Sequence, residues 1–199
     1  MTSTSNHGKI INIVILARGG QGAVTASQFI AEAAFLSGDL VDAHAYPSFG
    51  AERRGAPVQA YAKLSTEVQI WDRSFITAPD VLIVFDDSVL NHEIVSSLEK
   101  EGIFIVNSNK DPAYFKETYK LPDQTKIIVA DITKLAIEND LTIDGNPIVN
   151  TPILGLLAKA LPILTLENLE KIVNKRMDKE LSTLNNDLIK KGYELAKTL

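Results

Sequence analysis

The sequence contains no cysteine among its 199 residues. This absence excludes disulfides, thiolate zinc sites, cysteine nucleophiles and cysteine-ligated iron–sulfur clusters in this chain. No apolar run is long enough to cross a membrane. The opening segment, MTSTSNHGK, lacks the basic and apolar regions of a signal peptide. We therefore expect a cytoplasmic protein.

Positive charge is also scarce, since 20 Lys and Arg residues against 25 Asp and Glu residues leave a formal net charge of -5. Such a chain has no general attraction for nucleic acid or for anionic membranes, so we expect neither as a partner. His7, His44 and His92 stand apart, without the spacing of a metal site. The length predicts one domain over residues 10–199, preceded by a frayed polar tail over residues 1–9.

Apolar, β-branched segments alternate with segments of helical periodicity. Strands are predicted at Ile10–Ala17, Val41–Tyr46, Val58–Leu64, Val81–Phe85, Ile103–Val106 and Ile127–Val129. A turn at Ser65 and Thr66 and a further strand over Glu67–Trp71 would add an antiparallel hairpin. The alternation predicts an α/β fold: a mostly parallel, Rossmann-like sheet with helices on both faces, the added hairpin and a helical C-terminal section.

Helices are predicted at Ala23–Ser37, where Gly38 is placed to end the helix, and at Ser88–Glu101. Thr165 is predicted to cap a later helix, and a final helix is predicted from about Leu184 to Lys197. The helix after Thr165 places four apolar side chains on one face, namely Leu166, Leu169, Val173 and Met177.

Two start signals compete for the helix that runs to Leu161. Asn146-Pro147 and Thr151-Pro152 each offer a capping residue followed by proline at the first helical position. The sequence alone leaves both starts open.

A glycine turn lies between the first predicted strand and the first predicted helix. Backbone N–H groups at a helix start point outward and carry partial positive charge, and glycine lets a ligand or another chain approach the backbone closely. We therefore predict that Gly19, Gly20, Gln21 and Gly22 contact an anionic group or a neighbouring subunit. The alternative is a tight turn that only packs the helix against the strand.

Two missing glycine motifs and the position of Asp42 argue against a nucleotide site of the usual kinds. The pattern G-x-G-x-x-G is absent, and Asp42 falls early in the second strand rather than at the end where a ribose would lie. A phosphate-binding G-K-[ST] is also missing. Asp86 and Asp87 end a buried strand, where they would either cap the following helix or face a cleft.

A second loop, Phe49–Pro57, carries Glu52, Arg53, Arg54 and Gly55 between two strands. Arginine offers a planar fork of donors that suits phosphate or carboxylate. We predict that this loop lies beside the glycine turn and binds the same anion or a partner subunit. The alternative is a solvated charge cluster in which Glu52 neutralises one arginine.

Taken together, these motifs resemble the gamma subunits of the 2-oxoacid:ferredoxin oxidoreductases. The similar segments are ARGGQGAVTASQFIAEAAFLSG, YPSFGAERRGAPVQAYAKLS, PDVLIVFDDSVL and NPIVNTPILGLLAKAL. The resemblance covers most of the chain from Ile10 onward, and ERRGAP is closest to the pyruvate type, pyruvate synthase. Ala17 departs from the pattern, because many members have glycine there.

The resemblance implies a subunit of a complex that oxidatively decarboxylates a 2-oxoacid to acyl-coenzyme A and CO2 and passes electrons to ferredoxin. Thiamine diphosphate, Mg²⁺ and [4Fe-4S] clusters are implied on partner subunits of the alpha, beta and delta types. Coenzyme A is implied as the substrate that this chain helps to bind. No residue here matches a thiamine diphosphate motif, so the resemblance implies a non-catalytic role.

Two alternatives remain. The chain would be a purely structural assembly subunit of a complex for another 2-oxoacid, such as a branched-chain oxoacid, an aryl glyoxylate or 2-oxoglutarate. It would otherwise be a free-standing nucleotide-binding protein.

Overall fold

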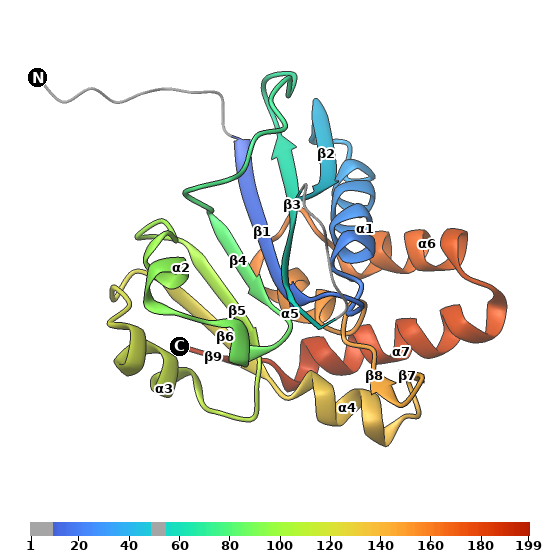
Figure 1. Ribbon diagram of the computed structural model, residues 1–199. Helices are drawn as coiled ribbons and strands as arrows, with labels where there is room; N and C mark the ends of the chain where they lie inside the picture. The colour runs from blue at the N-terminus through green and yellow to red at the C-terminus, as the bar shows by residue number, and fades with distance from the viewer. Residues whose placement is uncertain (1–9, 49–54) are drawn as a thin grey trace, which may run out of the picture.

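The computed structural model describes residues 10–48 and 55–199, and a seven-stranded sheet forms its centre (Figure 1). The strands, in the order in which they lie side by side, are β2 (Asp42–Pro47), β3 (Pro57–Ser65), β1 (Ile10–Arg18), β4 (Val81–Val84), β5 (Ile103–Asn107), β6 (Lys126–Ala130) and β9 (Lys197–Thr198). The strands β1, β4, β5 and β6 are parallel. Antiparallel pairing adds β3 and β2 at one edge and β9 at the other. A separate small hairpin joins β7 (Thr142–Ile143) to β8 (Asn146–Pro147).

Helices cover both faces of the sheet, as the prediction of an α/β fold requires (Figure 1). They are α1 (Ala23–Phe35), η1 (Asp87–Val89), α2 (His92–Ser96), α3 (Pro112–Tyr119), α4 (Ile132–Glu138), α5 (Leu154–Ala160), α6 (Leu166–Arg176) and α7 (Lys179–Leu195). One face packs against α2 and α3, and the other packs against α1 and the C-terminal helices α5, α6 and α7.

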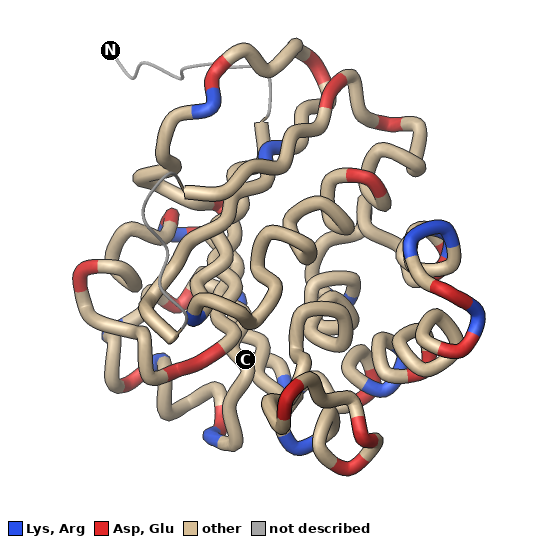
Figure 2. The backbone as a smooth tube through the Cα atoms, turned by 45° about the vertical axis from the view of Figure 1, so that its right-hand side comes forward, with Lys and Arg blue, Asp and Glu red and all other residues tan. Residues whose placement is uncertain are grey.

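The central strand shows why both faces need helices. In β1, Ile13 and Ile15 face the layer that contains α1, whereas Val14 and Leu16 face the layer that contains α2 and α3. All four are buried, because successive side chains of a strand point to opposite faces. Acidic and basic residues lie around the outside of the molecule, and the central strands are nearly free of them (Figure 2). None of the helices in the described ranges has the length and apolar composition needed to cross a membrane.

The predicted strand Glu67–Trp71 is wrong. β3 lies between β1 and β2, so both of its edges are already paired and no edge remains for a hairpin partner. The segment is irregular and is held by side chains instead: the Ile70 amide donates to the Asp42 carboxylate at 2.8 Å. Trp71 is 87% exposed.

The predicted helix Ser88–Glu101 is broken into two short pieces. Leu90 is extended between η1 and α2, and the Asn91 side chain caps α2 by accepting from the Ile94 amide at 2.8 Å. The helices α3 and α4 were not anticipated. In α4 the first turn is held by Asp131, which accepts from the Lys134 amide at 2.8 Å.

The C-terminal section follows the predicted order with shifted ends. The turn at Thr151-Pro152 precedes α5, whereas Asn146-Pro147 forms β8. Thr165 caps α6 as predicted, since its hydroxyl accepts from the Asn168 amide at 3.1 Å. The final helix begins earlier than Leu184 because Asp178 caps it, and it ends before Lys197, which pairs with β6.

Candidate functional site

A crevice lies at the carboxyl ends of the parallel strands. After β1 the chain turns into α1 on one face of the sheet, whereas after β4 it turns toward α2 on the other face. Two strands that part in this way leave a crevice between their ends, and such crevices are the usual ligand sites of open α/β sheets. One hollow of about 310 Å³ adjoins another of about 410 Å³, and both are lined by Gln21, Asp86 and Pro147.

The glycine turn forms one wall of this crevice. Gly19 and Gly20 line it, and Gly20 and Gly22 have φ angles of 98° and 79°. These left-handed values favour glycine, because a side chain would meet the backbone. Gly22 is the N-cap of α1, which has no side-chain cap and no acidic residue in its first turn. No acidic side chain in the first turn therefore offsets the positive end of the helix dipole, which is the end that attracts an anion.

The hydrogen bonds of the turn show which of its N–H groups are available. The Gly19 amide donates to the Ala56 carbonyl at 2.8 Å, and the Gln21 amide donates to the Arg18 carbonyl at 3.0 Å. The amides of Gly20 and Gly22 donate to no residue within 10–48 or 55–199. Two of the four predicted donors are thus used internally, and the other two remain for a ligand or a partner chain.

Asn150 packs beneath the turn. A Cβ added to Gly22 would lie 2.4 Å from the Asn150 Nδ2, so glycine is required here for space as well as for φ. The Asn150 Oδ1 is buried and has no hydrogen-bond partner among the described residues. Buried amide oxygens are rarely left unpaired. Sequence reasoning gave Asn150 no role, and its only signal was its place in the segment NPIVNTP.

Arg18 joins the turn to both neighbouring strands. Its Nε lies 2.9 Å from Asp86 Oδ2, its NH1 donates to the Gly55 carbonyl at 3.0 Å and its NH2 donates to Ser88 Oγ at 2.7 Å. Asp86 also caps η1 by accepting from the Ser88 amide at 3.0 Å. Burial alone would raise the pKa of Asp86, but hydrogen bonds from Ser88 and the pairing with Arg18 outweigh burial and lower it. Sequence reasoning missed Arg18, because its partners are distant in the chain.

Asp87 points along the crevice toward β5. Its Oδ2 accepts from the Ser108 hydroxyl at 2.8 Å and from the Lys110 ammonium at 3.0 Å. The bond to Asp87 raises the pKa of Lys110. Of the two roles foreseen for Asp86 and Asp87, Asp86 both caps and lines the crevice, whereas Asp87 lines it without capping η1.

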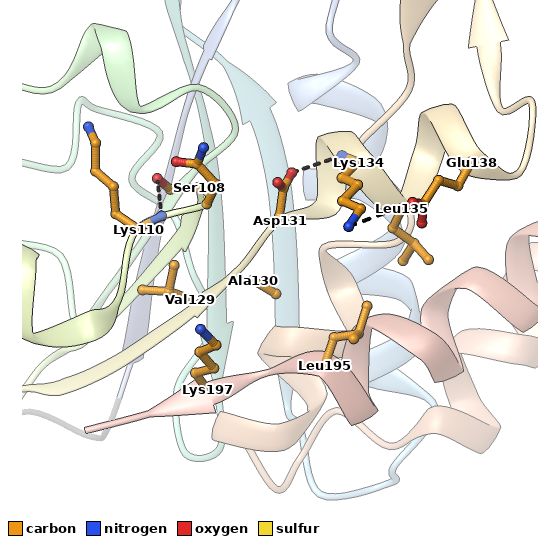
Figure 3. A pocket seen from close by; sticks show the side chains of 11 residues that line it. Ser108, Lys110, Val129, Ala130, Asp131, Lys134, Leu135, Glu138, Leu195 and Lys197 are labelled. Atoms are coloured by element: carbon orange, nitrogen blue, oxygen red, sulfur yellow. Dashed lines mark hydrogen bonds and ion pairs between the residues drawn. The ribbon is translucent and has the colours of Figure 1, made fainter.

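A third hollow of about 300 Å³ continues the crevice toward β9 (Figure 3). Lys110, Lys134 and Lys197 line it. Each lysine already has a carboxylate within reach: Asp87 at 3.0 Å, Glu138 at 3.7 Å and Asp111 at 2.6 Å, respectively. These three lysines therefore offer no unpaired cation to an anionic ligand.

The structure describes only some of the predicted site residues. Gly55 lies against the glycine turn, because its amide donates to the Gly19 carbonyl at 3.0 Å. Glu52, Arg53 and Arg54 lie outside the described residues, so their roles stay predictions. Within the described ranges, no group of three His, Asp or Glu side chains is arranged to hold a metal ion.

Known proteins resemble this chain over most of its length. A family model described as pyruvate ferredoxin/flavodoxin oxidoreductase matches residues 12–195. The pyruvate/ketoisovalerate oxidoreductases common subunit gamma of Pyrococcus furiosus is 39% identical over 186 residues, which cover 93% of this chain and 96% of that one. Pyruvate synthase subunit PorC of Thermotoga maritima is 38% identical over 184 residues, covering 90% of this chain and 91% of that one.

Solved structures share the fold. The crystal structure of the pyruvate oxidoreductase subunit PORC from Thermotoga maritima superposes with a TM-score of 0.79 at 34% identity, covering 96% of this chain and 98% of that one. A chain of 2-oxoglutarate:ferredoxin oxidoreductase from Magnetococcus marinus superposes with a TM-score of 0.72 at 17% identity. That match covers 95% of this chain but 31% of the other, so the same fold is there one part of a longer polypeptide.

Proposed function

The chain belongs to the pyruvate ferredoxin/flavodoxin oxidoreductase family, and from this premise we propose that it is the gamma-type subunit of a multisubunit 2-oxoacid:ferredoxin oxidoreductase. The complex carries out coenzyme A-dependent oxidative decarboxylation of pyruvate to acetyl-coenzyme A and CO2, with ferredoxin as electron acceptor. The names of the relatives that match nearly end to end, gamma and PorC subunits, support this assignment.

The division of labour in the complex follows from the composition of this chain. With no cysteine, it supplies no thiolate ligand to an iron–sulfur cluster. The [4Fe-4S] clusters, thiamine diphosphate and Mg²⁺ are accordingly assigned to partner subunits of the alpha, beta and delta types. This chain breaks no bond in the reaction, and ferredoxin meets the complex through other subunits.

The contribution of this chain is to position coenzyme A. The observation that carries the proposal is the open N-terminus of α1 at the crevice, where the Gly20 and Gly22 amides have no partner among the described residues. A phosphate of the coenzyme A diphosphate is the kind of group that such amides bind. Arg53 or Arg54 would add charge at the same end. Holding the coenzyme in this way lowers the entropic barrier to its reaction on a neighbouring subunit.

A single alanine substitution in the turn tests this proposal. Gly20→Ala places a Cβ where the phosphate would approach. The lost contact should cost about 1–3 kcal/mol, which raises the KM for coenzyme A roughly fivefold to 150-fold. The purified complex is assayed for KM values of coenzyme A and of the 2-oxoacid, and only the former should change.

Gly38→Ala is the matched control. Gly38 has a similar φ of 82°, and no atom lies within 4 Å of an added Cβ. It lies at the opposite end of α1 from the glycine turn, so the strain is comparable and the crevice is untouched. If both variants assemble with an unchanged KM for coenzyme A, the turn has a structural role and the chain is an assembly subunit.

The arginine loop is tested in the same assay. Lysine at position 53 or 54 keeps the charge but loses the planar fork. One of the variants Arg53→Lys and Arg54→Lys should raise the KM for coenzyme A, and the other should weaken subunit association. Binding of NAD or ATP by the purified chain alone would instead favour a free-standing nucleotide-binding protein.

A further inference from the structure

The Arg18 guanidinium makes its hydrogen bonds within the protein. One donor on each of its three nitrogens is used: Nε pairs with Asp86, NH1 donates to Gly55 and NH2 donates to Ser88. The charge is neutralised by Asp86, and the two side chains are 36% and 26% exposed. An anion entering the crevice would meet a neutral, partly buried pair, so Arg18 is a poor direct anchor for it.

These three bonds join the ends of three strands. Arg18 ends β1, Gly55 comes just before β3, and Asp86 and Ser88 follow β4. On the β3 side the backbone already connects the segments, since the Gly55 amide donates to the Gly19 carbonyl and the Gly19 amide donates to the Ala56 carbonyl. On the β4 side the last backbone bond to β1 is the one from the Phe85 amide to the Leu16 carbonyl at 2.8 Å. Beyond that bond, the hydrogen bonds between described residues that cross from the end of β1 to Asp86 and Ser88 are those of the Arg18 side chain.

We propose that Arg18 is a positioning residue that sets the distance between the glycine turn and the end of β4, and thereby holds the Gly20 and Gly22 amides in place for coenzyme A. The inference rests on the proposed function. It adds a residue whose effect is transmitted through the backbone rather than by touching the coenzyme.

Lysine cannot replace this residue. An ammonium group is a single point of charge, whereas the three acceptors lie around a planar fork and belong to separate segments. Arg18→Lys can keep the contact to Asp86 but releases Gly55 or Ser88. In the assembled complex we expect the KM for coenzyme A to rise about tenfold, while kcat and the KM for the 2-oxoacid stay within twofold. A merely structural role would lower the amount of active complex and leave the KM for coenzyme A unchanged.

Asp86→Asn gives a test that depends on the direction of the change. We call the three Arg18 contacts, to Asp86, Gly55 and Ser88, the clamp. If Arg18 positions the turn, loss of its carboxylate partner loosens the clamp and raises the KM for coenzyme A. If Arg18 were a direct ligand, the freed guanidinium would bind the coenzyme more tightly and lower that KM, which would overturn the proposal. The double variant Arg18→Lys/Asp86→Asn should raise the KM for coenzyme A no more than the single variant with the larger effect, because the effects of residues in one network are not additive. If the effects of the two substitutions on this KM instead add in the double variant, the proposal is also overturned.

Arg176→Lys is the matched control. Arg176 forms an ion pair with Glu32 between α6 and α1, away from the crevice, and this variant should leave the KM for coenzyme A unchanged.

If the complex with Arg18→Lys does not assemble, Ser88→Ala provides a second test. It removes one of the three contacts and should raise the KM for coenzyme A about threefold. An unchanged KM in that intact complex rejects the proposal. Gly20→Ala separates the two hypotheses: a KM raised by Gly20→Ala but not by Arg18→Lys refutes the clamp alone, whereas a KM unchanged by Gly20→Ala refutes coenzyme A binding at the turn.

Discussion

Lys63 carries a charge into a part of the sheet where its side chain is only 9% exposed. The ammonium donates to the Asp72 carbonyl at 3.0 Å and to the Asp72 carboxylate at 3.1 Å, and it lies 5.9 Å from the centre of the Tyr46 ring. A charge in such a place needs a partner, because burial without one is costly. The irregular segment after β3 is therefore held in place by a residue of β3 itself.

The pH dependence of stability should report the contacts that the Asp72 carboxylate makes with Ser74 and Lys63. Hydrogen bonds from the Ser74 hydroxyl and amide, and then from Lys63, lower the pKa of Asp72 from 3.8 to about 2. A carboxylate whose pKa is depressed on folding adds stability above its unfolded pKa and loses it as the pH falls through the folded value. Asp72→Asn should thus be less stable than the parent chain at pH 6, and the difference should shrink between about pH 4 and pH 2.

Urea unfolding of both chains from pH 2 to pH 7 measures this difference. Glu138→Gln is the control, because its exposed pair with Lys134 at 3.7 Å is expected to contribute little. A difference between Asp72→Asn and the parent that stays constant over this range would show that the contribution of Asp72 to stability does not depend on its charge.

At the scale of the elements, α5 and α7 cross with their backbones in contact. A Cβ added to Gly155 would lie 2.1 Å from the Ile189 carbonyl, and one added to Gly192 would lie 2.4 Å from the Pro152 carbonyl. The buried Thr151 hydroxyl binds the Asn185 side chain beside this crossing. The glycines therefore set the distance between the two helices, and α5 in turn packs against β5 and β6.

Gly155→Ala should destabilise the chain in spite of the better helix propensity of alanine. Propensity alone would favour alanine by about 1 kcal/mol, but overpacking against rigid backbone usually costs about 1–3 kcal/mol. At 2.1 Å we expect the upper end of that cost, a net loss of roughly 2 kcal/mol in the free energy of unfolding. Gly38→Ala, which adds strain without a clash, should cost about 1 kcal/mol. Chemical denaturation of the two variants and the parent chain decides, and a Gly155→Ala chain that is about 1 kcal/mol more stable than the parent would mean that α5 and α7 separate at no cost.

At the scale of the whole molecule, the chain has two cores, one on each face of the sheet, and a crevice at the carboxyl ends of the parallel strands. Its large exposed apolar side chains include Trp71 and Phe75 on the segment after β3. The proposed function requires further subunits, because a chain without cysteine holds no thiolate-ligated cluster to pass electrons to ferredoxin.

The purified chain should unfold cooperatively yet show no coenzyme A-dependent reduction of an electron acceptor with any 2-oxoacid. Activity should appear when the chain is mixed with its partner subunits, and the partners without this chain serve as the control. A panel of 2-oxoacids on the assembled complex then tests pyruvate against branched-chain oxoacids, aryl glyoxylates and 2-oxoglutarate. Turnover by the isolated chain would contradict a non-catalytic role.

Local patterns in the sequence determined the elements whose cause is local. The β-branched run Ile10–Ala17 became a central strand, and the glycines after it became a strand-to-helix turn. Thr165 capped its helix because capping needs only a side chain and the amides that follow it. The motifs of the turn and of ERRGAP also identified the family, which the comparisons confirmed.

Tertiary structure decided whatever depends on partners distant in the chain. The strand expected at Glu67–Trp71 is absent because β3 pairs with β1 and β2, and no local pattern reveals that both edges are occupied. The Arg18 side chain is a clamp rather than a free donor because Asp86, 68 residues away, reaches it across the crevice. Likewise, only the fold brings Asn150 against Gly22. Periodicity and capping depend on neighbours within a turn or two, whereas pairing of edges and charges depends on which segments the packed core brings together.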